Sequence, residues 1–180
     1  MTMFKGKIYF LKAYNSNRLD VRVADQNSDP RIASSLSVGV REIAAWLSDD
    51  VNSCLSAIEW VKRLECLDSA EAKGYLGTGN AHSVGVVKDY VFIECEFVED
   101  FKVLLRRECI VSMLKSYINA HEEYAGNVCV DVSVEMEGDQ ALSRYLELGG
   151  RLGLSDPEIA ENTRKVKSSR AKKTGKSQRR

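Results

Sequence analysis

The stretch Val128-Cys-Val-Asp-Val-Ser-Val-Glu-Met136 decides the fold class of this chain. Its apolar residues occupy every second position, and the positions between them hold Cys129, Asp131, Ser133 and Glu135. A period of two residues is the signature of a strand. One apolar face and one largely polar face are typical of an antiparallel sheet that is covered on one side.

The same alternation recurs from Tyr90 to Val98, where apolar residues on one face oppose Glu94 and Glu96 on the other. The acidic pair Glu99-Asp100 then indicates a turn, after which the chain returns antiparallel. Alternating or apolar runs elsewhere predict four more strands, at residues 7–12, 19–24, 81–87 and 101–105. The glycines between residues 74 and 79 indicate a loop.

Helical spacing of apolar residues separates these strands. The expected helices cover residues 40–47, 51–64, 107–121 and 140–148. Asp49-Asp50 is expected to interrupt the helical pattern between the first two of these helices. The sequence therefore predicts the α+β class, with an antiparallel sheet of about five or six strands and helices packed on one face.

The domain organisation follows from charge and turn signals. We expect a single α+β domain over residues 1–150, followed by a short helix at 151–163. That helix would begin at Ser155-Asp-Pro-Glu158, where a capping box is possible. The last 17 residues, 164–180, hold nine Lys/Arg and no acid, against 17 bases and 26 acids in the remainder. A segment so poor in apolar residues is expected to be disordered.

Composition argues against several classes of protein. No run of about 18 apolar residues occurs, so no membrane association is expected. The first ten residues lack a signal-peptide pattern, which favours the cytoplasm. Five widely spaced cysteines without C-x-x-C argue against a structural zinc site, and we expect buried, reduced thiols. No spacing of residues predicts a metal ion or a cofactor.

The candidates for catalysis are few. Gly77-Thr-Gly-Asn80 lacks the G-x-G-x-x-G spacing and the strand-to-helix context of a dinucleotide loop. The sequence leaves open a pairing of Cys95 with His82, but it positions no third group to orient them. We therefore expect no catalytic residues and no enzymatic activity.

Acidic residues form the more informative pattern. If the strands at 90–98 and 128–136 expose the same side of a shared sheet, their carboxylates would project from one surface. Such a surface would attract a basic protein and orient it. The alternative is a solvated strand face whose charge serves solubility alone. The candidate partner-binding residues are Glu94, Glu96, Glu99, Asp100, Asp131 and Glu135.

The basic tail supports a second hypothesis. Its side chains could contact phosphates without sequence specificity, which would make nucleic acid a possible partner. The residues that would do so are Lys165, Lys167, Arg170, Lys172, Lys173, Lys176, Arg179 and Arg180. The alternative is a solvated tail that folds back loosely on the acidic body.

Two segments carry a resemblance to a known group of proteins. Gly77-Thr-Gly-Asn-Ala-His-Ser-Val84 and Tyr90-Val-Phe-Ile-Glu-Cys-Glu-Phe-Val-Glu-Asp100 precede a returning strand and a helix that bears Tyr117. This arrangement resembles small bacterial immunity proteins of contact-dependent and other polymorphic toxin systems. The resemblance covers residues 1–121, and residues 127–180 lie outside it. It implies an α+β fold, no catalytic residues, and action by occlusion of a toxin.

Charge and resemblance together predict a cytoplasmic, non-enzymatic immunity or antitoxin-type protein. It would occlude a cognate toxin through an acidic surface, and a basic nuclease is the kind of toxin that such a surface suits. The alternative is a nucleic-acid-associated accessory protein that acts through residues 164–180.

Overall fold

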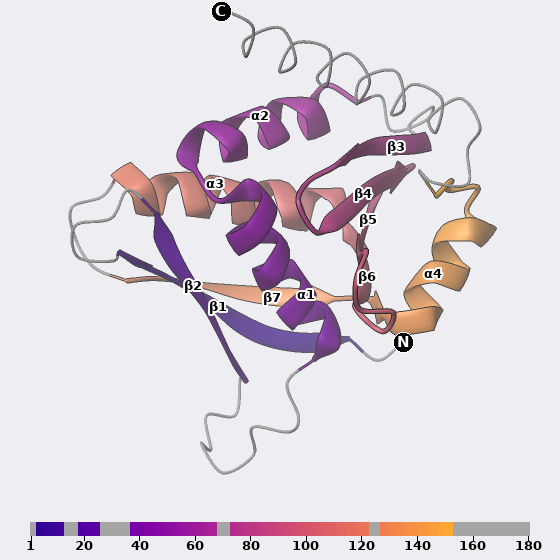
Figure 1. Cartoon of the computed structure of the whole chain (residues 1–180), viewed down its shortest axis with the longest axis horizontal. Helices are drawn as coiled ribbons and strands as arrows, with labels where there is room; N and C mark the ends of the chain where they lie inside the picture. The colour runs from indigo at the N-terminus through magenta and orange to yellow at the C-terminus, as the bar shows by residue number, and fades with distance from the viewer. Residues whose placement is uncertain (1–2, 13–17, 26–36, 68–72, 123–126, 153–180) are drawn as a thin grey trace, which may run out of the picture.

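The computed structural model describes residues 3–12, 18–25, 37–67, 73–122 and 127–152 (Figure 1). These residues form α-helices and two antiparallel sheets, which confirms the α+β class. The strands divide into a sheet of three and a sheet of five rather than forming one sheet. The basic tail at 164–180, and all but the first two residues of the expected helix at 151–163, lie outside the described residues.

The three-stranded sheet has the order β2-β1-β7, with every pair antiparallel. Its strands are β1 (Phe4–Lys12), β2 (Leu19–Asp25) and β7 (Val128–Val134). In its central strand, Ile8 and Phe10 are fully buried, and Ile8 is in register with Val23 on one side and Val130 on the other. The two N-terminal strands expected from the sequence are therefore confirmed and pair with each other, and β7 pairs with the other side of β1.

The five-stranded sheet has the order β3-β4-β5-β6-β8. Its strands are β3 (Lys73–Thr78), β4 (His82–Val87), β5 (Tyr90–Cys95), β6 (Lys102–Arg106) and β8 (Met136–Glu137). The glycine-rich segment expected to be a loop is the edge strand β3, with a register shift between Tyr75 and Gly77. The stretch from Val128 to Met136 thus gives strands to both sheets, because the chain crosses between them after Val134.

Helix α1 (Val38–Trp46) packs against strands of both sheets, and Figure 1 shows it near the centre of the molecule. Its first turn is capped twice. The Ser37 side chain accepts a hydrogen bond from the Val40 amide, and the Glu137 carboxylate accepts one from the Gly39 amide at 2.8 Å. Most of α1 is buried, as expected for a helix with protein on several sides.

A π-helical turn, η1 (Leu47–Val51), follows α1 and ends at Asn52, which adopts a left-handed conformation with φ of 38°. The interruption expected at Asp49-Asp50 is therefore confirmed. Ser53 then caps α2 (Cys54–Glu65), which packs against α3 (Arg107–Glu122). Residues of both sheets and of these helices share one core.

Helix α4 (Gly138–Glu147) covers the opposite face of the five-stranded sheet, so helices lie on both faces of that sheet (Figure 1). A second, smaller core forms here, in which Tyr145 stacks on Phe92 with 4.6 Å between ring centroids. The sequence indicated one covered face, because Glu94 and Glu96 alternate on the same side as Phe92. Among the described helices, none has the length and hydropathy needed to cross a membrane.

Candidate functional site

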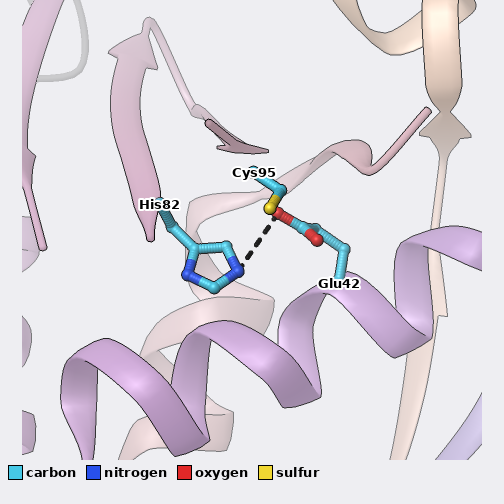
Figure 2. Close-up of side chains that lie close together, drawn as sticks. All are labelled: Glu42, His82 and Cys95. Atoms are coloured by element: carbon cyan, nitrogen blue, oxygen red, sulfur yellow. Dashed lines mark ion pairs between the residues drawn. The ribbon is translucent and has the colours of Figure 1, made fainter. Parts of the chain in front are cut away.

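Glu42, His82 and Cys95 meet between α1 and the five-stranded sheet (Figure 2). His82 and Cys95 are cross-strand partners on β4 and β5, so their side chains lie next to each other on one face. Glu42 reaches them from α1, which covers that face. The carboxylate, imidazole and thiol atoms all lie within 4.8 Å of one another. With Asp50, these residues are called the buried cluster below.

Asp50 holds His82 from the side away from Glu42. Its carboxylate is hydrogen-bonded to Nδ1 of His82, and both side chains are almost fully buried, with exposed fractions of 2% and 1%. The same carboxylate accepts hydrogen bonds from the backbone amides of Asn80 and Ala81. Burial raises the pKa of Asp50, but the bonds from His82 and Asn80 outweigh it, so the pKa of this carboxyl is lowered.

The loop before β4 is shaped around the Asp50 carboxylate. A Cβ atom at Gly79 would overlap that carboxylate, so only glycine fits there. The Asn80 side-chain amide also donates to the backbone carbonyl of Asp49 at 2.9 Å. The segment Gly77–Asn80, which lacks the pattern of a dinucleotide loop, therefore contributes an amide that binds a carboxylate of its own chain.

Glu42 is the least expected member of the buried cluster, because its side chain is fully buried. Burial, reinforced by the nearby carboxylates of Asp50, Glu94 and Asp49, raises the pKa of Glu42 to about 8. Its Oε1 lies 3.5 Å from Nε2 of His82. Neither oxygen of Glu42, nor Nε2 of His82, has a hydrogen-bond partner among the described residues.

The arrangement has two chemical uses. Asp50, His82 and Cys95 follow the order of an orienting acid, a base and a nucleophile. Alternatively, Glu42, His82 and Cys95 offer an oxygen, a nitrogen and a sulfur atom to one cation. The sequence left the pairing of His82 with Cys95 open, and the structure brings these two together with a third group.

Sequence reasoning missed Glu42 and Asp50. One signal for Glu42 was present, since Gly39, Glu42 and Trp46 recur at helical spacing and all three are buried. The helical spacing of α1 does not predict that Asp50 is buried. Asp50 lies on a π-helical turn, where side chains point in other directions than a regular α-helix would place them.

The six acidic residues expected to bind a partner do not share one face, because β5 and β7 belong to different sheets. Glu94 is half-buried beside α4, and burial raises its pKa despite the nearby charge of Lys102. Glu135 pairs with Arg106 at 3.0 Å. Asp131 is exposed, but it lies on the three-stranded sheet, in register with Lys7.

The remaining three acids lie together where β5 leaves the sheet and turns back to β6. Glu96, Glu99 and Asp100 are exposed there, and Phe97 and Val98 between them have exposed fractions of 75% and 43%. We call residues Glu96–Asp100 the β5–β6 tip.

Backbone hydrogen bonds fix the base of this tip. The Glu96 amide donates to the Ala81 carbonyl at 2.8 Å, and the Cys95 amide donates to the Phe101 carbonyl at 2.9 Å. The Ser83 hydroxyl also donates to the Glu96 carboxylate at 2.8 Å. The tip is therefore an ordered projection rather than a loose loop.

The cysteines are less buried than the sequence indicated. All five are free thiols. Cys54, Cys95 and Cys109 are half-buried, and Cys66 and Cys129 are exposed, the latter because it lies on the polar face of β7. The eight basic residues expected to contact nucleic acid, from Lys165 to Arg180, lie outside the described residues.

Comparisons with protein-family models, with curated proteins and with solved structures each find no match to this chain.

Proposed function

We propose that this chain is a non-enzymatic immunity or antitoxin-type protein that occludes a basic toxin, with a nuclease as the kind of toxin expected. The observation that carries the proposal is the β5–β6 tip, where Phe97 projects into solvent between three carboxylates. The resemblance of residues 1–121 to immunity proteins supports the same function. The acidic surface is thus smaller than the sequence suggested and is centred on Glu96, Glu99 and Asp100.

The tip combines two properties of protein-binding surfaces. An exposed aromatic side chain can act as an anchor that fills a pocket on the partner, and such anchors supply much of the binding free energy. Carboxylates around the anchor raise the association rate of a basic partner and set its orientation. Because backbone hydrogen bonds hold the tip, little conformational entropy is lost when it binds.

The test begins with a pull-down by the intact chain from cells that carry its gene. The captured protein should be basic, should arrest growth when it is produced alone, and should become harmless when this chain is co-produced. Calorimetry then compares the wild type with Phe97→Ala, which we expect to weaken binding about 30-fold, the equivalent of about 2 kcal/mol. Reversal of Glu96, Glu99 and Asp100 to Lys should slow association, most strongly at low salt.

Glu59→Lys is the matched control, because Glu59 is an exposed acid on α2 away from the tip. Asp131→Lys tests whether the three-stranded sheet takes part in binding. Glu94 is not used, because a charge reversal at a half-buried residue would disturb folding as well as binding. Unchanged affinity after both the Phe97 and the triple charge substitutions would refute the role of the tip, and a harmless captured protein would refute the toxin-neutralising function.

The charge segregation of the sequence favours a second candidate function, a nucleic-acid-associated accessory protein. Nine of the last 17 residues are basic and none is acidic. A gel-shift assay should compare the full chain with a chain that ends at Glu161. This candidate requires binding that weakens steeply with salt and disappears on truncation. Equal nucleic-acid binding by the full and the truncated chain would contradict this second candidate function.

A further inference from the structure

The buried cluster contains more unpartnered polar atoms than a protein interior normally tolerates. Both carboxylate oxygens of Glu42 and Nε2 of His82 are buried without a hydrogen-bond partner among the described residues. Buried polar atoms are nearly always hydrogen-bonded, since an unsatisfied group keeps the full cost of its desolvation. One carboxylate oxygen of Glu42, one ring nitrogen of His82 and Sγ of Cys95 lie within 4.8 Å of one another, and the three side chains point toward one another in Figure 2.

We propose that Glu42, His82 and Cys95 bind a divalent transition-metal ion, and that this ion is zinc. One cation would give a partner to the carboxylate and to the imidazole Nε2 at the same time. The proposal goes beyond the function proposed above and does not depend on it.

The spacing of the atoms suits a zinc ion. Two ligands about 2.1 Å from a tetrahedral ion lie about 3.4 Å apart. Oε1 of Glu42 and Nε2 of His82 are 3.5 Å apart, and the sulfur atom of Cys95 lies within 4.8 Å of both groups. A fourth coordination position remains for a water molecule.

Asp50 prepares His82 for this role. Because the Asp50 carboxylate is hydrogen-bonded to Nδ1, the proton of a neutral imidazole resides on that nitrogen, and the lone pair of Nε2 faces Glu42 and Cys95. Metal-binding histidines commonly donate their other N–H to a carboxylate, which fixes the ring and raises its basicity. Asp50 is thus a positioning residue, held in turn by the amides of Asn80 and Ala81.

The charge around the buried cluster also favours a cation. Glu42 and Cys95 would contribute two negative charges as ligands, and Asp50 and Glu94 are further carboxylates that act on Glu42. A dication would balance the two ligand charges. The mixed ligand set selects zinc over magnesium or calcium, because those ions prefer oxygen ligands throughout.

The alternative use of the same side chains, a Cys95 nucleophile with His82 as base and Asp50 as orienting acid, leaves Glu42 unexplained. A nucleophilic pair needs no buried carboxylate beside the base. Metal binding accounts for all four members of the buried cluster, with three as ligands and one as a positioning residue.

The test uses the full chain, reduced and stripped of metal with a chelator, without any protein partner. Competition with a zinc-binding dye should show one equivalent of Zn²⁺ bound. Addition of Co²⁺ in place of zinc should give the visible absorption of tetrahedral cobalt and a thiolate-to-cobalt charge-transfer band. Cys95→Ser should abolish the charge-transfer band, and both Cys95→Ser and Glu42→Gln should weaken zinc binding at least about 100-fold.

A variant with both Cys66→Ser and Cys129→Ser is the matched control, because exposed thiols can also bind zinc. It should keep the full equivalent of zinc and the charge-transfer band. If Cys95→Ser does not fold, Glu42→Gln decides the matter, since glutamine matches the shape of a protonated glutamate. Absence of stoichiometric binding by the wild type, binding unaffected by Glu42→Gln, or loss of binding in the double control would each overturn the proposal.

Discussion

His82 at the start of β4 and Asp50 on the π-helical turn η1 form a buried, hydrogen-bonded pair that ties the helical layer to the five-stranded sheet. The pair joins residues 32 positions apart in the chain. Because the Asp50 carboxylate also accepts two backbone amides, its loss would leave the buried His82 ring and the amides of Asn80 and Ala81 without this acceptor.

We therefore predict that Asp50→Ala lowers the free energy of unfolding by about 3 kcal/mol, since removal of one partner leaves the other buried and unpaired. Urea denaturation at neutral pH measures this. Asp49→Ala is the adjacent control and should change stability by less than about 0.5 kcal/mol, because the side chain of Asp49 is exposed and the hydrogen bonds from Asn52 and Asn80 go to its backbone carbonyl. Equal effects of the two substitutions would contradict the prediction.

A second prediction concerns the loop that surrounds the Asp50 carboxylate. Gly79→Ala should lower the free energy of unfolding by about 2 kcal/mol, because the added methyl group overlaps the carboxylate and forces the loop away. Gly77→Ala, two residues earlier, should be close to neutral, since a Cβ there makes only ordinary contacts at 3.8 Å or more. Thermal denaturation of the two variants measures the difference in stability. An unchanged stability of Gly79→Ala would show that the loop can move away from the Asp50 carboxylate at little cost.

The packing of α4 gives a third prediction. Tyr145 is fully buried, stacks on Phe92 and donates a hydrogen bond from its hydroxyl to the Arg151 carbonyl at 2.9 Å. Tyr145→Ala should cost about 3–5 kcal/mol and should release α4, whereas Tyr145→Phe should cost about 1 kcal/mol.

Hydrogen exchange of the α4 amides, combined with urea denaturation, measures both effects. Leu146→Ala is the control, because Leu146 is exposed on the same helix and should change stability by less than about 0.5 kcal/mol. Full protection of the α4 amides in Tyr145→Ala would show that the smaller core does not depend on this ring.

The fourth prediction concerns pH. Burial, together with the charge of Lys12, lowers the pKa of His121 below its usual value of 6.5. The unfolded chain therefore binds a proton at this residue more readily than the folded chain does, so stability should fall as the pH drops below about 6.5. This loss should continue until the pH passes the folded pKa of His121.

His121→Phe keeps a ring against Tyr117, to which His121 now makes an edge contact, and removes the titrating group. Denaturation curves of the wild type and of His121→Phe between pH 7.5 and pH 5 should diverge, with the variant losing less stability on acidification. Parallel curves would indicate that His121 is free to protonate in the folded protein.

Local pattern in the sequence was enough to predict most elements of the fold. The alternation in β1, β2, β5 and β7 and the helical spacing of α1 to α4 correspond to the structure, because each pattern reflects how one element divides its side chains between core and solvent. The glycine-rich edge strand β3 was missed, since glycine weakens every local signal for a strand.

The candidate site was only half predictable. His82 and Cys95 could be named as a possible pair, because two adjacent antiparallel strands place them in register. Glu42 and Asp50 could not, since their roles depend on how α1 and η1 lie over the sheet. The expectation that the acids of β5 and β7 share one face was wrong, because the two strands belong to different sheets. Alternation along each strand does not show which sheet the strand joins.

The sequence by itself determined the α+β class, the order of most helices and strands, and the separation of an acidic body from a basic tail. These features are properties of short segments and of composition. Only the tertiary structure decided the division into two sheets, the second core under α4, and the meeting of Glu42, Asp50, His82 and Cys95. Those outcomes depend on contacts between residues far apart in the chain, whose free energy comes from burial and is invisible to any local pattern.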